Sequence, residues 1–137
     1  MKLKRIDITK TFRPTPEARE YAKWLKNKKV FERVIDAYLF AAAFALKNDL
    51  EIFPIPSKDR QHIVVNLLDL IDDDVCLALE AAVYAIRKRN KLPQPNDSDE
   101  LIEIISQYAE AGIIHLKQKW QGKIVNQIQD DICKILN

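Results

Sequence analysis

The sequence predicts a mainly α-helical single domain, residues 1–137, with five to six helices around a buried central helix and a short N-terminal β-strand. Three observations lead to this prediction. The chain of 137 residues contains only 2 glycines, which disfavours folds built on tight hairpins. Hydrophobic residues make up 47% and charged residues 31%, a balance typical of compact helical proteins. Finally, residues 30–47 are apolar on almost every side.

That apolar stretch, VFERVIDAYLFAAAFALK, runs from Val30 to Lys47 and is predicted to form the central helix. It carries no charge between Asp36 and Lys47, and a helix that is apolar all round is a buried one. Its small residues, Ala41 to Ala43, would let a neighbouring backbone approach closely. The charge-free part is well short of the roughly 20 residues that a bilayer requires, so we expect no membrane partner.

The N-terminal strand is predicted over Leu3–Phe12, where isoleucines alternate with polar residues. A single strand needs a partner. Within the chain the candidate is Glu51–Ile55, which Pro54 and Pro56 would restrict to a sheet edge. Alternatively, two copies of the N-terminal strand would pair across a homodimer.

The first helix is predicted over Pro16–Asn27, since Thr15 can cap it and proline suits the first helical position. Its apolar stripe would comprise Ala18, Tyr21, Ala22, Trp24 and Leu25. The later helices are predicted at Lys58–Leu70, Val75–Arg89, Asp99–Gln121 and Lys123–Leu136. Gly112 would mark a close contact between helices, and Gly122 a break before the amphipathic last helix.

Two of the connections between these helices are predicted to be longer loops. The segment Asp49–Ser57 must be extended because of its prolines, and we expect its apolar side chains, Ile52, Phe53 and Ile55, to enter the core. The second loop, residues 91–98, ends with Asp97 followed three residues later by Glu100, a spacing that resembles a capping box.

The sequence offers little catalytic chemistry. Cys76 and Cys133 lie in apolar helical contexts, which favours buried free thiols and a cytoplasmic, reducing location. The acidic run Asp72–Asp74 lacks the alternating pattern of a calcium loop, and His62 and His115 have no ligand partners at metal-binding spacing. We therefore expect no enzyme activity, no catalytic residue, no metal and no cofactor. An enzyme using Asp72–Asp74 is the most distant alternative.

Charge is distributed unevenly along the chain. Residues 1–33 hold eleven basic and four acidic residues, a net charge of +7, whereas the remaining 104 residues carry −5. Such asymmetry suggests contact with a polyanion, although a solvated basic surface would show it too. The predicted phosphate-binding residues are Lys2, Lys4, Arg5, Lys10 and Arg13, flanked by Arg19, Lys23 and Lys26.

The N-terminal portion, residues 1–49, has the order strand, helix, helix. Ribbon-helix-helix modules share this order, and in them the strands of two protomers pair and enter the major groove. The second helix here is longer and more buried than such a module requires. The remainder, residues 50–137, is predicted to be helical.

Three passages resemble the accessory proteins associated with Dnd systems, which are found with DNA phosphorothioate modification and restriction. They are VFERVIDAYLFAAAFALKND, IFPIPSKDRQHIVVNLLDLIDDDVCLAL and LIEIISQYAEAGIIHLKQKW, and together they cover most of residues 30–120. The third has the family's Tyr-Ala pair followed by a glycine, here Tyr108, Ala109 and Gly112. The first departs from the pattern, because Ala45 or Leu46 stands where the family has a glycine.

The resemblance implies a non-enzymatic helper in a bacterial DNA-modification defence locus, with other proteins of that system as partners. Combined with the charge asymmetry, it leads us to expect a homodimeric accessory protein that contacts DNA through its basic N-terminal third. The alternative is a protein-interaction adaptor that docks through its amphipathic C-terminal helix, Ile124 to Leu136.

Overall fold

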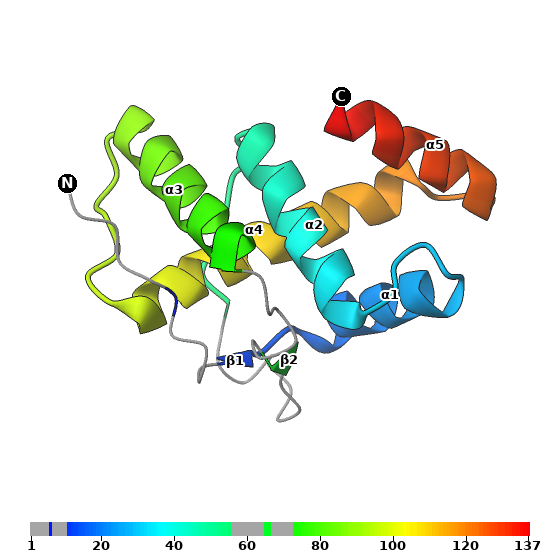
Figure 1. Cartoon of the computed structure of the whole chain (residues 1–137), viewed down its shortest axis with the longest axis horizontal. Coiled ribbons are helices and arrows are strands. Elements are labelled where there is room, and N and C mark those ends of the chain that lie inside the picture. The colour runs from blue at the N-terminus through cyan, green and yellow to red at the C-terminus, as the bar shows by residue number, and fades with distance from the viewer. Residues whose placement is uncertain (1–5, 7–10, 56–64, 67–72) are drawn as a thin grey trace.

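The computed structural model describes residues 6, 11–55, 65–66 and 73–137. Over these ranges the chain is a mainly α single domain of five helices. The helices are α1 (Pro16–Asn27), α2 (Val34–Lys47), α3 (Asp73–Arg89), α4 (Ser98–Lys119) and α5 (Val125–Leu136). Figure 1 shows α2 lying across α4, with α3 on one side of α2 and α1 and α5 on the other.

The helix α2 occupies the centre of the core, as predicted. Nine of its 14 residues are buried, and α4 is its main packing partner. It begins at Val34 rather than Val30, because the Asp36 carboxylate accepts hydrogen bonds from the Arg33 backbone N–H (3.2 Å) and guanidinium (2.8 Å) and fixes the first turn there. Among the described residues, no helix combines the length and apolarity that crossing a bilayer would require.

The crossing of α2 and α4 depends on Gly112. A Cβ built on this residue would lie 2.6 Å from the carbonyl carbon of Ala41 and 3.1 Å from its Cα. Carbon atoms in contact are normally about 3.5–4.0 Å apart, so no residue other than glycine fits without displacing a helix. The prediction that Gly112 marks a close helix contact is therefore confirmed, and its partner is Ala41, one of the small residues expected to let a neighbouring backbone approach.

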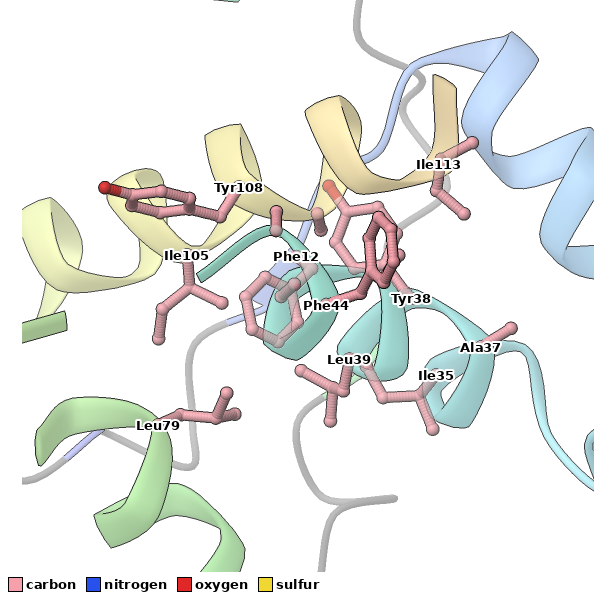
Figure 2. Close-up of a cluster of buried hydrophobic side chains, with 14 of the residues drawn as sticks. Phe12, Ile35, Ala37, Tyr38, Leu39, Phe44, Leu79, Ile105, Tyr108 and Ile113 are labelled. Atoms are coloured by element: carbon pink, nitrogen blue, oxygen red, sulfur yellow. The ribbon is translucent and has the colours of Figure 1, made fainter. Parts of the chain in front are cut away.

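Aromatic and aliphatic side chains fill the space around this crossing (Figure 2). Phe12 is fully buried and packs on Tyr38 of α2 with ring centroids 5.7 Å apart and a 59° interplanar angle. Ile105 and Tyr108 come from α4, and Leu79 comes from α3. The segment before α1 is thus tied into the core by a large aromatic side chain.

Extended pairing in the described residues is limited to two residues on each side. β1 (Thr11–Phe12) pairs antiparallel with β2 (Val65–Asn66), Thr11 opposite Asn66. So short a pair does not establish the strand predicted over Leu3–Phe12, whose other residues, Ile6 apart, lie outside the described ranges. The helix predicted over Lys58–Leu70 also lies mostly outside them, and at Val65–Asn66 that prediction is wrong. The proposed edge strand Glu51–Ile55 has no regular secondary structure, as its prolines allow.

The expectation that Phe53, in the segment that follows α2, enters the core is wrong. Its side chain is 66% exposed, whereas Ile52 packs against the core. In an extended segment successive side chains point to opposite sides, so neighbouring residues do not both face inward. The apolar composition of the segment does not reveal which of its residues are the inward ones.

Three helices end in the same way, with a non-glycine residue in the left-handed conformation. Lys29, Asp49 and Lys91 have φ values of 62°, 50° and 57° and follow α1, α2 and α3. At the first of them the Val30 N–H donates to the Leu25 carbonyl (2.9 Å), and the Lys29 N–H donates to the Lys26 carbonyl (2.9 Å). This is the Schellman pattern, in which glycine is the usual residue. With only 2 glycines in the chain, other residues take these positions.

The last two helices follow the sequence prediction closely. The Glu100 N–H donates to the Asp97 side chain (2.9 Å), as in a capping box. The Glu100 carboxylate accepts from the Asn96 N–H (2.7 Å), whereas in a standard box it would accept from the N–H of the capping residue, Asp97. Gly122, at φ 77°, lies within the connection between α4 and α5. Ile128 anchors α5 with 0% exposure, and the Trp120 indole N–H donates to the Asp131 carboxylate (2.7 Å).

Candidate nucleic-acid interface

Four of the eight predicted phosphate-binding residues can be located. Lys2, Lys4, Arg5 and Lys10 lie outside the described residues. Arg13 is exposed just before α1, and Arg19, Lys23 and Lys26 lie on that helix, Arg19 half-buried and the two lysines exposed. Residues three and four apart are neighbours on a helix surface, so the latter three share one side of α1.

The orientation of α1 follows from its buried face and its first turn. Ala18, Ala22 and Leu25 pack into the core, which leaves the opposite face outward. Thr15 caps the helix, as predicted, because its hydroxyl oxygen accepts from the Ala18 N–H (3.2 Å). The cap in turn is held by α4, since the Thr15 hydroxyl donates to Glu110 Oε1 (2.7 Å) and the Thr15 N–H donates to Glu110 Oε2 (3.1 Å).

Glu110 connects three helices. Besides the two bonds from Thr15, it accepts one from the Tyr38 hydroxyl of α2 (3.1 Å). Nothing in the sequence singles out this residue, because its partners are 72 and 95 positions away. It fixes where the basic helix α1 sits relative to the body of the protein.

The outward face of α1 contains a shallow hollow of about 460 Å³. Its walls are formed by Pro16, Arg19, Glu20, Lys23, Trp24 and Asn27. The structure therefore brings Arg19 and Lys23 together in one concavity, while Arg13 and Lys26 lie outside its lining. One carboxylate, that of Glu20, lies among these cations.

The prediction that Trp24 belongs to the apolar stripe of α1 is wrong. Its side chain is 39% exposed and lines the hollow instead of packing in the core. Helical geometry could have signalled this, since residue 24 lies about 100° around the helix from the buried Leu25. The Trp24 ring stacks on Tyr21, with centroids 5.7 Å apart and an interplanar angle of 12°. Burial raises the pKa of the Tyr21 hydroxyl to about 12.

A second cluster of lysines, with one histidine, lies in residues 34–137, the part of the chain that carries net negative charge. Lys47, His115, Lys119 and Lys134 line a cleft of about 770 Å³ between α2, α4 and α5, and its described lining includes no carboxylate. Each lysine stands in the last turn of its helix, where a cation offsets the negative end of the helix dipole. Lys47 also donates to the Ile135 carbonyl (2.6 Å), and Lys119 lies 3.9 Å from Asp131. Stabilisation of the three helix ends therefore accounts for the positions of these lysines.

A concavity larger than either of these is an apolar groove of about 950 Å³ along α2 and α3. Its lining is mostly apolar, with Arg33, Asp36 and Lys47 as the charged members; the apolar members are Phe31, Leu39, Phe40, Ala43, Leu46, Val75, Ala78, Leu79, Ala82, Ala85, Ile86 and Leu136. On each helix these residues recur at three- and four-residue spacing, so each contributes one continuous stripe. The groove is not apparent from the sequence, because its two walls come from distant segments.

The residues considered for metal or thiol chemistry are dispersed. In the described ranges no three His, Cys, Asp or Glu side chains are grouped as metal ligands would be. Asp74 is exposed in the first turn of α3, and Asp72 and His62 lie outside the described residues. Cys76 is buried as expected, but Cys133 is exposed, because it lies on the outward side of α5.

Comparisons with protein-family models, curated proteins and solved structures found no match to this chain. The likeness of its three passages to the Dnd-associated accessory proteins therefore remains a hypothesis from sequence.

Proposed function

We propose that this protein is a non-catalytic accessory protein of a bacterial DNA phosphorothioation modification and restriction system, and that it contacts DNA through its basic N-terminal third. The observation that supports the DNA contact is the outward face of α1, where Lys23 and Lys26 are exposed beside Arg19. Lys28 and Lys29, both exposed, continue the positive charge past the end of the helix.

The charges allow an estimate of the salt dependence. Each phosphate neutralised by a cation contributes a slope of about −0.9 to the plot of log affinity against log salt concentration. Engagement of Arg13, Arg19, Lys23 and Lys26 would give a slope of about −3.6, and the four basic residues of the N-terminal segment would steepen it further. Contacts of this kind supply affinity without reading base sequence.

The test is binding of the intact protein to a short DNA duplex, with and without phosphorothioate, over a salt series. A variant with Lys23→Ala and Lys26→Ala should bind more weakly, with a slope shallower by about 1.8. The matched control changes Lys88 and Lys91 to alanine, which removes the same charge from exposed positions at the far end of α3. Absence of binding at low salt, or equal loss in both variants, would refute the proposed DNA contact.

The link to the defence system has its own readout in the same series. Tighter binding to the phosphorothioate duplex than to the unmodified duplex would support it, and equal binding would leave DNA contact without that link. The homodimer expected from N-terminal strand pairing stays a prediction, which light scattering of the purified protein would test.

The alternative function, a protein-interaction adaptor, is favoured by the apolar groove along α2 and α3. We propose as its occupant an amphipathic helix of a partner protein, because the two parallel stripes of the groove match the apolar stripe of a helix. The outer face of α5 offers a partner protein less apolar surface than the sequence suggests, since Ile128 is buried in the protein's own core.

The two functions respond to different substitutions. Ala43→Glu places a charge at an exposed position in the groove and should abolish capture of a helical partner while leaving DNA binding intact. Loss of partner capture in the Lys23 and Lys26 variant instead would argue against the groove. Ile128→Asn is unsuitable for this purpose, because a polar group at a fully buried position destabilises the whole domain.

A further inference from the structure

The one exposed tryptophan of this protein stands on the outward face of α1, across from its basic residues. Of the two tryptophans in the chain, Trp24 is 39% exposed and Trp120 is 2% exposed. Trp24 lines the hollow on α1 together with Arg19, Lys23 and Asn27. An aromatic ring among cations is the combination by which proteins hold unpaired nucleic acid bases, the ring stacking on the base and the cations holding the phosphates.

The ring is held in place before any ligand arrives. Trp24 stacks on Tyr21 almost in parallel, with centroids 5.7 Å apart and an interplanar angle of 12°. The Lys117 ammonium of α4 lies 6.0 Å from the centroid of the Tyr21 ring, so the stack is braced against the neighbouring helix. A ring already fixed in orientation loses little conformational entropy when a base stacks on it.

The polar groups around the hollow are arranged for a nucleotide rather than for a simple anion. On the helix, Arg19, Lys23 and Lys26 lie on one side of the outward face and Trp24 on the other, with Glu20 and Asn27 between them. The Glu20 carboxylate disfavours a phosphate at the centre but can accept a hydrogen bond from a base amino group. The Asn27 amide can both donate to and accept from a base edge.

We propose that the outward face of α1 binds single-stranded nucleic acid in preference to duplex, an unpaired base stacking on Trp24 while Lys23 and its neighbouring cations hold the flanking phosphates. This inference rests on the proposed nucleic-acid contact and names its substrate class. In a duplex the faces of the bases are covered by stacking, so only the phosphate contacts remain. One base stacked on an aromatic side chain changes affinity by about 5- to 150-fold.

The test compares a fluorescein-labelled single-stranded oligonucleotide of mixed pyrimidines with the matched duplex of the same length, at one salt concentration, by fluorescence anisotropy. The single strand should bind the intact protein about 5- to 150-fold more tightly than the duplex. Trp24→Ala should remove that preference by weakening binding of the single strand. Trp24→Phe, which keeps an aromatic ring at this half-exposed position, should retain part of it.

Intrinsic fluorescence gives an independent readout. Because Trp120 is buried and hydrogen-bonded to Asp131, quenching of the tryptophan signal by the single strand should come from Trp24 and be absent in Trp24→Ala.

Equal affinity for single strand and duplex, or an unchanged preference in Trp24→Ala, would overturn the inference while the proposed DNA contact survives. Failure of the intact protein to bind either nucleic acid at low salt would overturn both.

Discussion

Replacing Gly112 by alanine tests the central packing feature of the fold. In an isolated helix the change would be favourable, because alanine has the higher helix propensity by about 1 kcal/mol. Here the added methyl group would meet the backbone of Ala41 in α2, with the carbonyl carbon 2.6 Å away. The two effects have opposite signs, so the measured sign shows which one dominates.

The steric effect should dominate. Restoring ordinary carbon contacts requires α2 and α4 to separate by about 1 Å, which weakens every dispersion contact along their crossing. Overpacking a core costs about 1–3 kcal/mol, and we take about 4 kcal/mol here because the obstacle is a helix backbone and not a movable side chain. After subtraction of the propensity gain, the free energy of unfolding should fall by about 3 kcal/mol, a large part of a typical total of about 5–15 kcal/mol.

Urea denaturation followed by circular dichroism measures this change. The control is Ala111→Gly, which reports helix propensity one residue away and should cost about 1 kcal/mol. The double variant Ala41→Gly with Gly112→Ala should remain destabilised, because the contact is with the backbone of residue 41. If Gly112→Ala stabilises the protein by about 1 kcal/mol, the close crossing described above is wrong.

Three further predictions concern single residues. Lys29→Gly should stabilise the protein by about 1 kcal/mol relative to Lys29→Ala in thermal melts, since both remove the same charge and only glycine relieves the left-handed backbone at φ 62°. Glu110→Ala should lower the free energy of unfolding in urea titrations by about 2 kcal/mol, and Tyr38→Phe, which removes one of the three bonds to that carboxylate, by about 1 kcal/mol. Because the folded-state pKa of Tyr21 is raised to about 12, stability should decline as pH rises from 10 toward 12, and Tyr21→Phe should remove a phenolate step near pH 12 from an absorbance titration.

The helices were largely predictable because their signals are local. The segment Pro16–Asn27 was predicted with both ends correct, since Thr15, Pro16 and the basic residues after it all act within one turn of the helix ends. The central helix was recognised from composition alone, because a helix without a polar face has to be buried. Its true start depends on the pairing of Arg33 with Asp36, a contact that a periodic pattern does not contain.

The candidate site was less predictable, since it depends on which side of a helix faces outward and on contacts between distant segments. The basic residues of α1 were identified from charge, but Trp24 was assigned to the core because it is apolar. Glu110 was missed because a glutamate in a long amphipathic helix resembles a solvated residue. The apolar groove was not predicted because its walls, α2 and α3, meet only in the folded chain.

The weak anchoring of α5 has a consequence for motion. It is held by the buried Ile128, the contacts of Trp120 and Lys119 with Asp131, the bond from Lys47 to the Ile135 carbonyl, and the partial burial of Ile132 and Ile135. By contrast, α2 and α4 interlock along their whole crossing. Amide protons of α5 should therefore exchange with solvent through local opening, well before those of α4, which require global unfolding. Leu136, on the last turn of α5, forms part of the apolar groove. One border of that groove thus belongs to a helix that opens more readily than α4, so local opening of α5 would uncover this end of the groove without disturbing the crossing of α2 and α4.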